Sequence, residues 1–112
     1  MAKPATRPYS RYTREAAELM GKLIRLGRTE QKMTAQDLAD RAGISRGLLQ
    51  RIEKGDLKCE VGAVFEVAAI VGVKLFDANS KSLESHISRV DDTLSLLPKY
   101  VRKKARKVDD EF

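Results

Sequence analysis

The chain has 112 residues, which fits one ordinary domain with a tail to spare. Its composition is 42% hydrophobic but only 5% aromatic, with no tryptophan, so the core must consist mainly of aliphatic side chains, as in packed helices. The net charge of +6 favours an anionic partner but does not choose between DNA, RNA and an anionic membrane.

Residue usage excludes several classes of site. Cys59 is the single cysteine and His86 the single histidine, so neither an internal disulfide nor an ordinary Cys/His zinc site can form. The sequence has no phosphate-binding glycine loop, nucleophile elbow or metal-spaced cluster, so we expect neither an enzyme nor a cofactor. No apolar run approaches the roughly 18 residues of a membrane span, which predicts a cytoplasmic protein without a membrane partner.

The chain is predicted to begin with a flexible arm and a first helix. Residues 1–13 combine proline with basic residues and contain no acidic residue, a mixture that disfavours regular structure. From Arg14 to about Lys32, apolar residues such as Leu23 and Ile24 recur at three- and four-residue steps, which is typical of an amphipathic helix. The arm either follows the minor groove of a DNA partner or stays in solvent, and the sequence favours neither.

Two short helices joined by a sharp turn are predicted next. Thr34 and Asp37 have the spacing of a capping box, which marks a helix start. Gly43 then supplies the residue that most easily adopts the left-handed conformation at a helix end. Ser45 can cap a third helix over residues 46–54.

Two further helices and a charged tail complete the predicted organisation. Residues 59–71 are nearly all apolar and rich in β-branched side chains, which suits a strand, but the length of the segment favours a buried helix. Residues 77–98 are predicted to hold an amphipathic helix whose apolar residues form one narrow stripe, which either joins two copies of the chain or packs on the chain's own helices. The stripe residues are Leu83, Ile87, Val90, Leu94 and Leu97. Residues 99–112 are first basic and then acidic, and we expect a disordered tail.

The stretch from Thr34 to Gly55, TAQDLADRAGISRGLLQRIEKG, has the pattern of a helix-turn-helix, whose second helix fits the major groove of DNA. It resembles the Xre/Cro family of phage and bacterial repressors, and the likeness covers about residues 20–76. The resemblance implies a lambda-repressor-like domain over residues 14–76, in an all-α chain of about five helices that binds double-stranded DNA. In that family a glutamine commonly follows the threonine that opens the second helix, whereas Ala35 stands there in this sequence.

The resemblance also implies roles for individual side chains. An arginine can donate two hydrogen bonds to guanine, and a glutamine can pair with adenine in the same way. The implied base-reading residues are Ser45, Arg46, Gly47, Gln50 and Arg51, and the implied phosphate contacts are Thr34, Gln36, Lys54 and Lys58. Leu48 either touches a thymine methyl group or packs on a dimer partner. Arg28 and Glu53 match an ion pair of similar repressors and are expected to be structural.

The C-terminal sequence LSLLPKYVRKKARKVDDEF looks like the end of HipB-like antitoxins, which are DNA-binding partners of HipA-type serine/threonine kinases. This resemblance implies autoregulation of a toxin–antitoxin operon and docking of the kinase around Phe112. The alternatives are an orphan repressor with a solubilising tail, or a module that mainly binds and neutralises a protein partner. Because repressors of this type usually bind as symmetric dimers, we expect a homodimer on an inverted-repeat operator.

Overall fold

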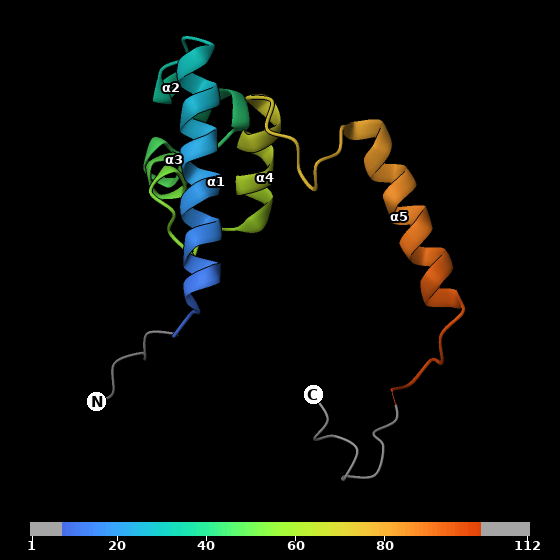
Figure 1. Cartoon of the computed structure of the whole chain (residues 1–112). Coiled ribbons are helices and arrows are strands. Elements are labelled where there is room, and N and C mark those ends of the chain that lie inside the picture. Colours follow the sequence, from blue (N-terminus) through green and yellow to red (C-terminus); the bar gives the residue numbers. More distant parts are fainter. Residues whose placement is uncertain (1–7, 102–112) are drawn as a thin grey trace. The chain divides into compact units, whose positions relative to one another are not determined.

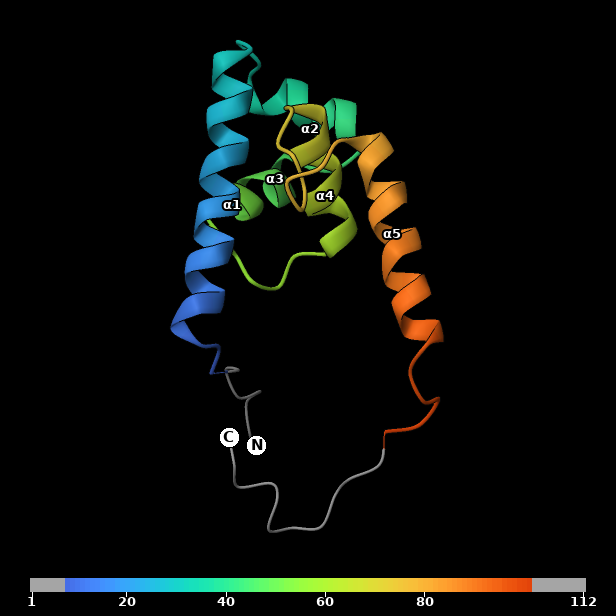
Figure 2. The ribbon, with the colours of Figure 1, turned by 45° about the vertical axis from the view of Figure 1, so that its right-hand side comes forward.

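The computed structural model describes residues 8–101 of the chain. This part contains the five helices α1 (Arg11–Glu30), α2 (Ala35–Ala42), α3 (Arg46–Glu53), α4 (Val61–Ile70) and α5 (Ser80–Ser95), shown in Figures 1 and 2. No strand occurs between residues 8 and 101, so the predicted all-α class is confirmed. The chain divides into two compact units, Met1–Asp77 and Ala78–Phe112.

The first helix begins earlier than the sequence pattern predicted. The hydroxyl oxygen of Ser10 accepts a hydrogen bond from the backbone N–H of Thr13, so Ser10 caps α1 and the helix starts at Arg11 rather than Arg14. The predicted arm of residues 1–13 therefore includes three helical residues at its end. The first seven residues of that predicted arm lie outside the described part of the chain.

Local signals explain why α2 and α3 form where they do. Thr34 and Asp37 make both hydrogen bonds of the capping box at the start of α2. Gly43 ends α2 with a φ of 71°, a left-handed conformation that costs glycine little. Ser45 caps α3 by accepting a hydrogen bond from the backbone N–H of Leu48. The two predicted helices and the turn between them are confirmed.

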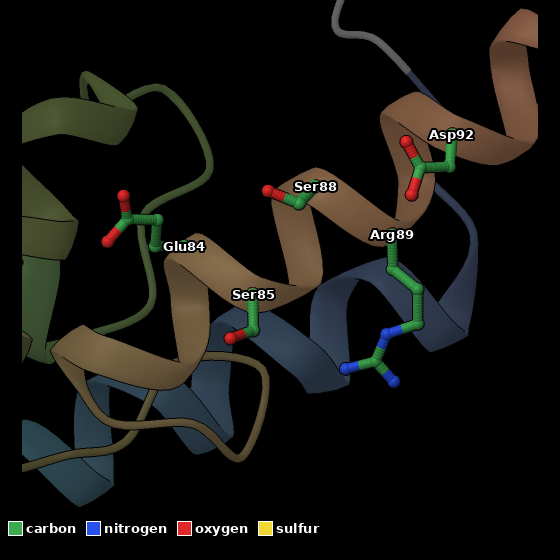
Figure 3. Close-up of a pocket in the computed structure, with 5 residues that line it drawn as sticks. All are labelled: Glu84, Ser85, Ser88, Arg89 and Asp92. Atoms are coloured by element: carbon green, nitrogen blue, oxygen red, sulfur yellow. The ribbon is translucent and has the colours of Figure 1, made fainter.

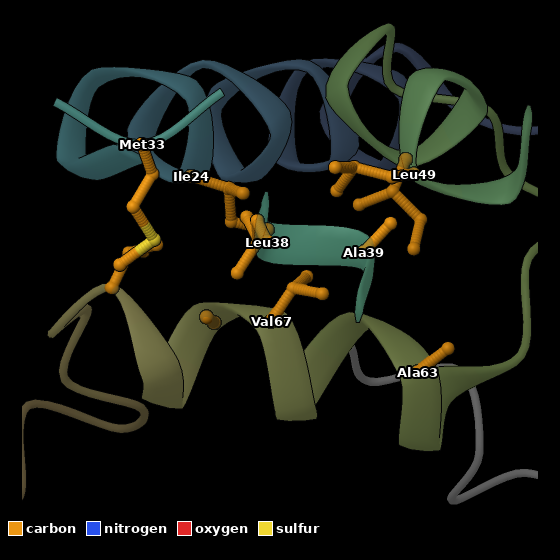
Figure 4. Close-up of a cluster of buried hydrophobic side chains, with 10 residues drawn as sticks. Ile24, Met33, Leu38, Ala39, Leu49, Ala63 and Val67 are labelled. Carbon is orange, nitrogen blue, oxygen red and sulfur yellow. The ribbon is translucent and has the colours of Figure 1, made fainter. Parts of the chain in front are cut away.

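The core of the first unit lies among α1, α2, α3 and α4 (Figure 4). Ile24, Leu38, Leu49 and Val67 are its largest fully buried side chains, and each comes from a different helix. The apolar segment after Cys59 is a helix and not a strand, as predicted, but only the side that carries Val67 is buried, while Val61 and Phe65 are exposed. Because all four helices contribute to one cluster, the packing fixes the positions of α2 and α3.

The side of α1 that faces α3 requires a small residue. A Cβ atom built on Gly21 would lie 2.6 Å from the carbonyl oxygens of both Ile52 and Glu53. These are backbone atoms, which cannot move aside as the end of a flexible side chain can. Gly21 therefore permits α1 to approach the end of α3 closely, and any larger residue would push the two helices apart.

The second unit contains α5, which is capped at its start and is shorter than the predicted segment of residues 77–98. The side chain of Asn79 accepts a hydrogen bond from the backbone N–H of Ser82, and the hydroxyl oxygen of Ser82 accepts one from the backbone N–H of Asn79, in a second capping box. The helix ends at Ser95, so Leu97 of the predicted stripe lies beyond its end. The cause is Pro98, which disfavours helical backbone in the residue before it.

Candidate nucleic-acid interface

The helix-turn-helix presents the N-terminal end of α3 to solvent. Arg46, Gly47 and Gln50 are exposed, whereas Leu49 and Ile52 of the same helix are buried in the core. A Cβ atom built on Gly47 would meet no other atom within 4 Å, so the surface beside it is open. Such an open polar helix face, supported from behind by a packed core, is what entry into a major groove requires.

Arg46 and Gln50 form the most accessible pair of candidate base readers. Their positions are four apart on α3, so their side chains leave the helix on the same face. Within residues 8–101 neither side chain has a hydrogen-bonding or ionic partner, so both are available to base edges. One arginine and one glutamine on a single face can together distinguish a guanine from an adenine.

Arg51 has a different environment from Arg46. Arg51 lies five positions after Arg46, which turns it about 140° away from Arg46 around the helix axis. The Nε atom of Arg51 donates a hydrogen bond to Oδ2 of Asp56 at 2.8 Å, and this ion pair lowers the pKa of the Asp56 carboxyl and raises the pKa of Arg51. The second carboxylate oxygen of Asp56 accepts from the backbone N–H of Lys58. To read a base, Arg51 would have to leave Asp56.

Ser45 and two of the phosphate candidates already have structural roles. The hydroxyl oxygens of Ser45 and Thr34 accept the capping hydrogen bonds of α3 and α2, which leaves each hydroxyl hydrogen free to be donated. The amide of Gln36 donates to Oδ1 of Asp40 at 2.8 Å on the exposed side of α2. Lys54 and Lys58 are exposed at the end of α3 and in the loop after it, where an ammonium group can reach a phosphate.

A pair of charged side chains joins the helix-turn-helix to α1. Arg28 donates to both carboxylate oxygens of Glu53, at 2.8 Å and 2.9 Å, and a third hydrogen bond runs from Arg28 to the carbonyl oxygen of Met33. The side chains of Arg28 and Glu53 are only 15% and 11% exposed. The hydrogen bonds to Glu53 raise the pKa of Arg28, so its guanidinium stays charged. It connects α1, the turn before α2 and the end of α3.

Positive charge also gathers beside the end of α3. A hollow of about 530 Å³ between α1 and this end is lined by the basic residues Arg14, Lys22, Arg25 and Lys54, together with Glu18, Glu53, Gly55 and Leu57. Glu18 pairs with Lys22 at 3.8 Å, and Glu53 is already paired with Arg28. The remaining cations extend the positive field of the first unit from α3 onto α1.

The other hollows and reactive groups of the described residues do not form a catalytic or ligand-binding arrangement. A hollow of about 410 Å³ in the second unit is lined by Glu84, Ser85, Ser88, Arg89 and Asp92, all from α5 alone, so it runs along one helix and is not enclosed (Figure 3). Burial raises the pKa of the Cys59 thiol, and Cys59 packs against the core, as expected for a structural cysteine. Residues 8–101 contain no group of side chains that could hold a metal ion.

Sequence reasoning missed the contribution of Asp56. The sequence pattern gave Asp56 no role, but Asp56 determines where the guanidinium of Arg51 lies. The signal was present in principle, because an acidic residue close behind a basic one at a helix end is a possible ion pair. Phe112, the predicted docking residue, lies outside the described residues.

Comparison with known families agrees with the geometry of α2 and α3. A family model described as helix-turn-helix matches residues 24–76, which run from the middle of α1 to the segment after α4. Residues 24–76 form a lambda-repressor-like helix-turn-helix domain. Proteins that match this family model are DNA-binding transcription regulators, which supports a DNA-binding role for this domain.

No curated protein matches the chain. Between residues 8 and 101, no helix combines the length and the apolar character that crossing a membrane requires.

Proposed function

We propose that the chain is a sequence-specific transcriptional repressor that binds an inverted-repeat operator as a homodimer. The observation that carries this proposal is the open face of α3 with Arg46 and Gln50, held in place by the ion pair between Arg28 and Glu53. Arg46 and Gln50 read base edges, with Ser45 and Gly47 beside them at the start of the helix. Lys54, Lys58, Thr34 and Gln36 contact phosphates. Arg51 contributes to base reading only after it has left Asp56.

The proposed reading face is tested by fluorescence-anisotropy binding to the DNA upstream of the gene and to scrambled DNA, at one near-physiological salt concentration. Loss of a bidentate contact costs about 1 to 3 kcal/mol, so Arg46→Ala should weaken specific binding by roughly 5- to 150-fold. Arg51→Ala should have a smaller effect, because its guanidinium is already paired. Lys74→Ala is the matched control, since it removes one exposed cation from the segment after α4.

The two possible outcomes are distinct. A loss that is larger for the upstream DNA than for scrambled DNA supports base reading by Arg46. Equal and weak binding of the unsubstituted protein to both DNAs would overturn the proposal of a specific repressor, and α5 and the tail would become the first place to look for function.

A narrower proposal concerns the biological role of the repressor. We infer that the chain is the antitoxin of a toxin–antitoxin pair, regulates that operon, and binds a HipA-type serine/threonine kinase through its C-terminal tail. The support is the resemblance of LSLLPKYVRKKARKVDDEF to HipB-like antitoxins. A segment of this composition that ends in an aromatic residue can order in the groove of a partner.

The antitoxin role is tested with the product of the gene next to that of this chain. If that gene encodes a kinase, the purified kinase should bind the full chain by calorimetry, and Phe112→Ala should weaken the binding at least tenfold while operator binding stays unchanged. A neighbouring gene of another kind, or a kinase that does not bind, would leave an orphan repressor.

A protein-interaction module is the second candidate function, and α5 is the observation that favours it. The apolar residues Ile87, Val90 and Leu94 are exposed along one side of this helix. Exposed apolar stripes of this kind are typical of helices that pack on a partner surface. The anisotropy experiment separates the two candidates, because a module of this kind would not distinguish the upstream DNA from the scrambled sequence.

A further inference from the structure

A second apolar stripe, which the function proposed above does not use, runs along α1. Its members are Tyr12, Ala16, Leu19, Leu23 and Leu26, all of which are exposed. Leu19 is 58% and Leu26 54% exposed, although leucine is among the residues most often found inside a protein. At 100° per residue, the stripe lies about a third of a turn away from Ile24, which faces the core. The α1 stripe is therefore not part of the four-helix core.

The spacing of the α1 stripe is that of a helix that packs against another helix. Its members follow one another at alternating steps of four and three residues, the pattern of a coiled-coil seam. From Tyr12 to Leu26 the stripe extends for about 21 Å along α1, at 1.5 Å per residue. Leu23, which the sequence pattern grouped with Ile24, belongs on this side, because it is 37% exposed while Ile24 is fully buried.

The α5 stripe has the same pattern. Its members within the helix are Leu83, Ile87, Val90 and Leu94, again at alternating steps of four and three residues. The last three are 61%, 57% and 59% exposed. From Leu83 to Leu94 the α5 stripe covers about 16 Å, so it fits within the length of the α1 stripe.

We propose that the α1 stripe is the docking surface for α5 of a second copy of the chain. The inference rests on the proposed dimer and identifies the surfaces that form it. In a symmetric pair, α5 of each copy lies on α1 of the other, so two equivalent contacts cover all four stripes. A dimer held by α5 against α5 alone would leave both α1 stripes in water.

Charge favours α5 over a second α1 as the occupant. Helix α1 carries five basic and three acidic residues, and α5 carries two basic and three acidic residues. Two α1 helices side by side would bring together two elements with net positive charge, whereas α1 and α5 have opposite net charges. Packing of α1 on α5 within one chain would cover both stripes but would not join two copies, which an inverted-repeat operator requires.

The test uses two variants that each damage one stripe. The α1 variant carries Leu19→Asp and Leu26→Asp, and the α5 variant carries Ile87→Asp and Leu94→Asp. Each substitution places a carboxylate where an apolar contact is proposed, so each variant alone should be a monomer, with its dimer dissociation constant raised at least a hundredfold. The molar mass is measured by light scattering after gel filtration. The protein concentration is about 100 µM, so that a dimer held by only one of the two contacts would still be detected.

Mixing the two variants gives the decisive result. In a mixed pair, the intact α5 of the α1 variant can lie on the intact α1 of the α5 variant, so one of the two contacts is restored and the equimolar mixture should contain dimer. A dimer held by α1 against α1, or by α5 against α5, would not regain a contact in the mixture. A mixture that remains monomeric overturns the proposal, as does an α1 variant that is still a dimer.

Controls keep the outcome interpretable. Val61→Asp and Leu96→Asp change exposed apolar residues outside the two stripes and should leave the dimer intact. Circular dichroism confirms that each variant is folded, and alanine instead of aspartate at the same four positions replaces any variant that is not. An unsubstituted chain that is a monomer would overturn both this inference and the proposed dimer, while the DNA-binding measurement tests the reading face separately.

Discussion

Both units of this chain contain well-capped helices, but the helices of the two units are stabilised in different ways. Helices α1 to α4 share a core in which Ile24, Leu38, Leu49 and Val67 are fully buried. Helix α5 has a complete capping box at Asn79, but its larger apolar residues are exposed. Capping and spacing are thus enough to specify where a helix forms, whereas packing determines how stable it is. The difference agrees with the proposed roles, in which the first unit carries the DNA-reading face and α5 packs on a second copy of the chain.

Amide hydrogen exchange should show the largest difference between the two units. Amides of Leu38 and Leu49 should exchange only through global unfolding, which costs about 5 kcal/mol or more in a small domain, so their exchange should be slowed by roughly a thousandfold or more. Amides within α5 should be slowed by about a hundredfold at most in dilute protein, because an isolated helix of this length is marginal in water. Exchange measured residue by residue by NMR provides the comparison.

The same measurement can also test the contrast at higher protein concentration. If α5 packs on a second copy, its protection should rise as the dimer forms, while protection of the core changes less. Protection of α5 equal to that of the core in dilute, monomeric protein would mean that the second unit has its own source of stability, and the contrast drawn above would be wrong.

Breaking the ion pair that joins α1 to α3 should produce the next largest effect. Arg28→Met leaves the carboxylate of Glu53 buried without its partner, and such a loss costs about 3 kcal/mol of unfolding free energy. Urea unfolding followed by circular dichroism measures the change. Operator binding should also weaken, because the pair holds the end of α3 in place.

The double variant Arg28→Met with Glu53→Met separates the pair's contribution from the cost of an unpaired charge. Removing both charges should be less destabilising than removing Arg28 alone, because no uncompensated charge stays buried. A double variant that is as unstable as the sum of the two single variants would show that the two side chains act independently.

The sequence predicted α2 and α3 well because their determinants are local. The capping box of Thr34 and Asp37 and the left-handed Gly43 act within a few residues of the chain, and all three have the geometry that their spacing implied. The segment after Cys59 was also assigned correctly, since its length outweighed the β-branched residues that suit a strand.

Other features could not be predicted from the sequence. They depend on contacts between segments that are distant in the chain, or on two apolar patterns that overlap in one helix. The need for Gly21 arises from the carbonyl oxygens of Ile52 and Glu53, which no periodicity in α1 indicates. The α1 stripe overlaps the core-facing pattern, so Leu23 could not be separated from Ile24 until burial was known. The pairing of Arg51 with Asp56 depends on the path of the loop after α3.

Adding a methyl group at Gly21 should destabilise the first unit by about 2 kcal/mol. In Gly21→Ala the new Cβ atom meets two backbone oxygens of α3, so the helices must separate and the core loses contact. Gly62→Ala is the matched control within α4, because no atom lies within 4 Å of its Cβ position. It should raise the unfolding free energy by up to about 1 kcal/mol, the usual gain when alanine replaces glycine in a helix. Thermal unfolding of the two variants should shift in opposite directions.

The smallest expected effect is the pH dependence of the α2 cap. The backbone N–H of Thr34 donates to the carboxylate of Asp37, which lowers the pKa of Asp37 below its usual value. A carboxyl whose pKa is lower in the folded than in the unfolded state contributes stability above its unfolded pKa of about 3.9, and this contribution is lost as the pH falls through the folded pKa. The unfolding free energy should therefore decrease below about pH 4.

Asp37→Asn isolates the contribution of this carboxylate, because the amide cannot be protonated in this range. At pH 6 the unsubstituted protein should be the more stable of the two, and the difference between them should shrink as the pH is lowered toward 2, measured as urea midpoints. Asp56 responds in the same direction through its pair with Arg51, so both proteins should still lose some stability in acid. A difference that stayed constant with pH would show that Asp37 caps α2 without its charge, and that the start of α2 depends on hydrogen-bond geometry alone.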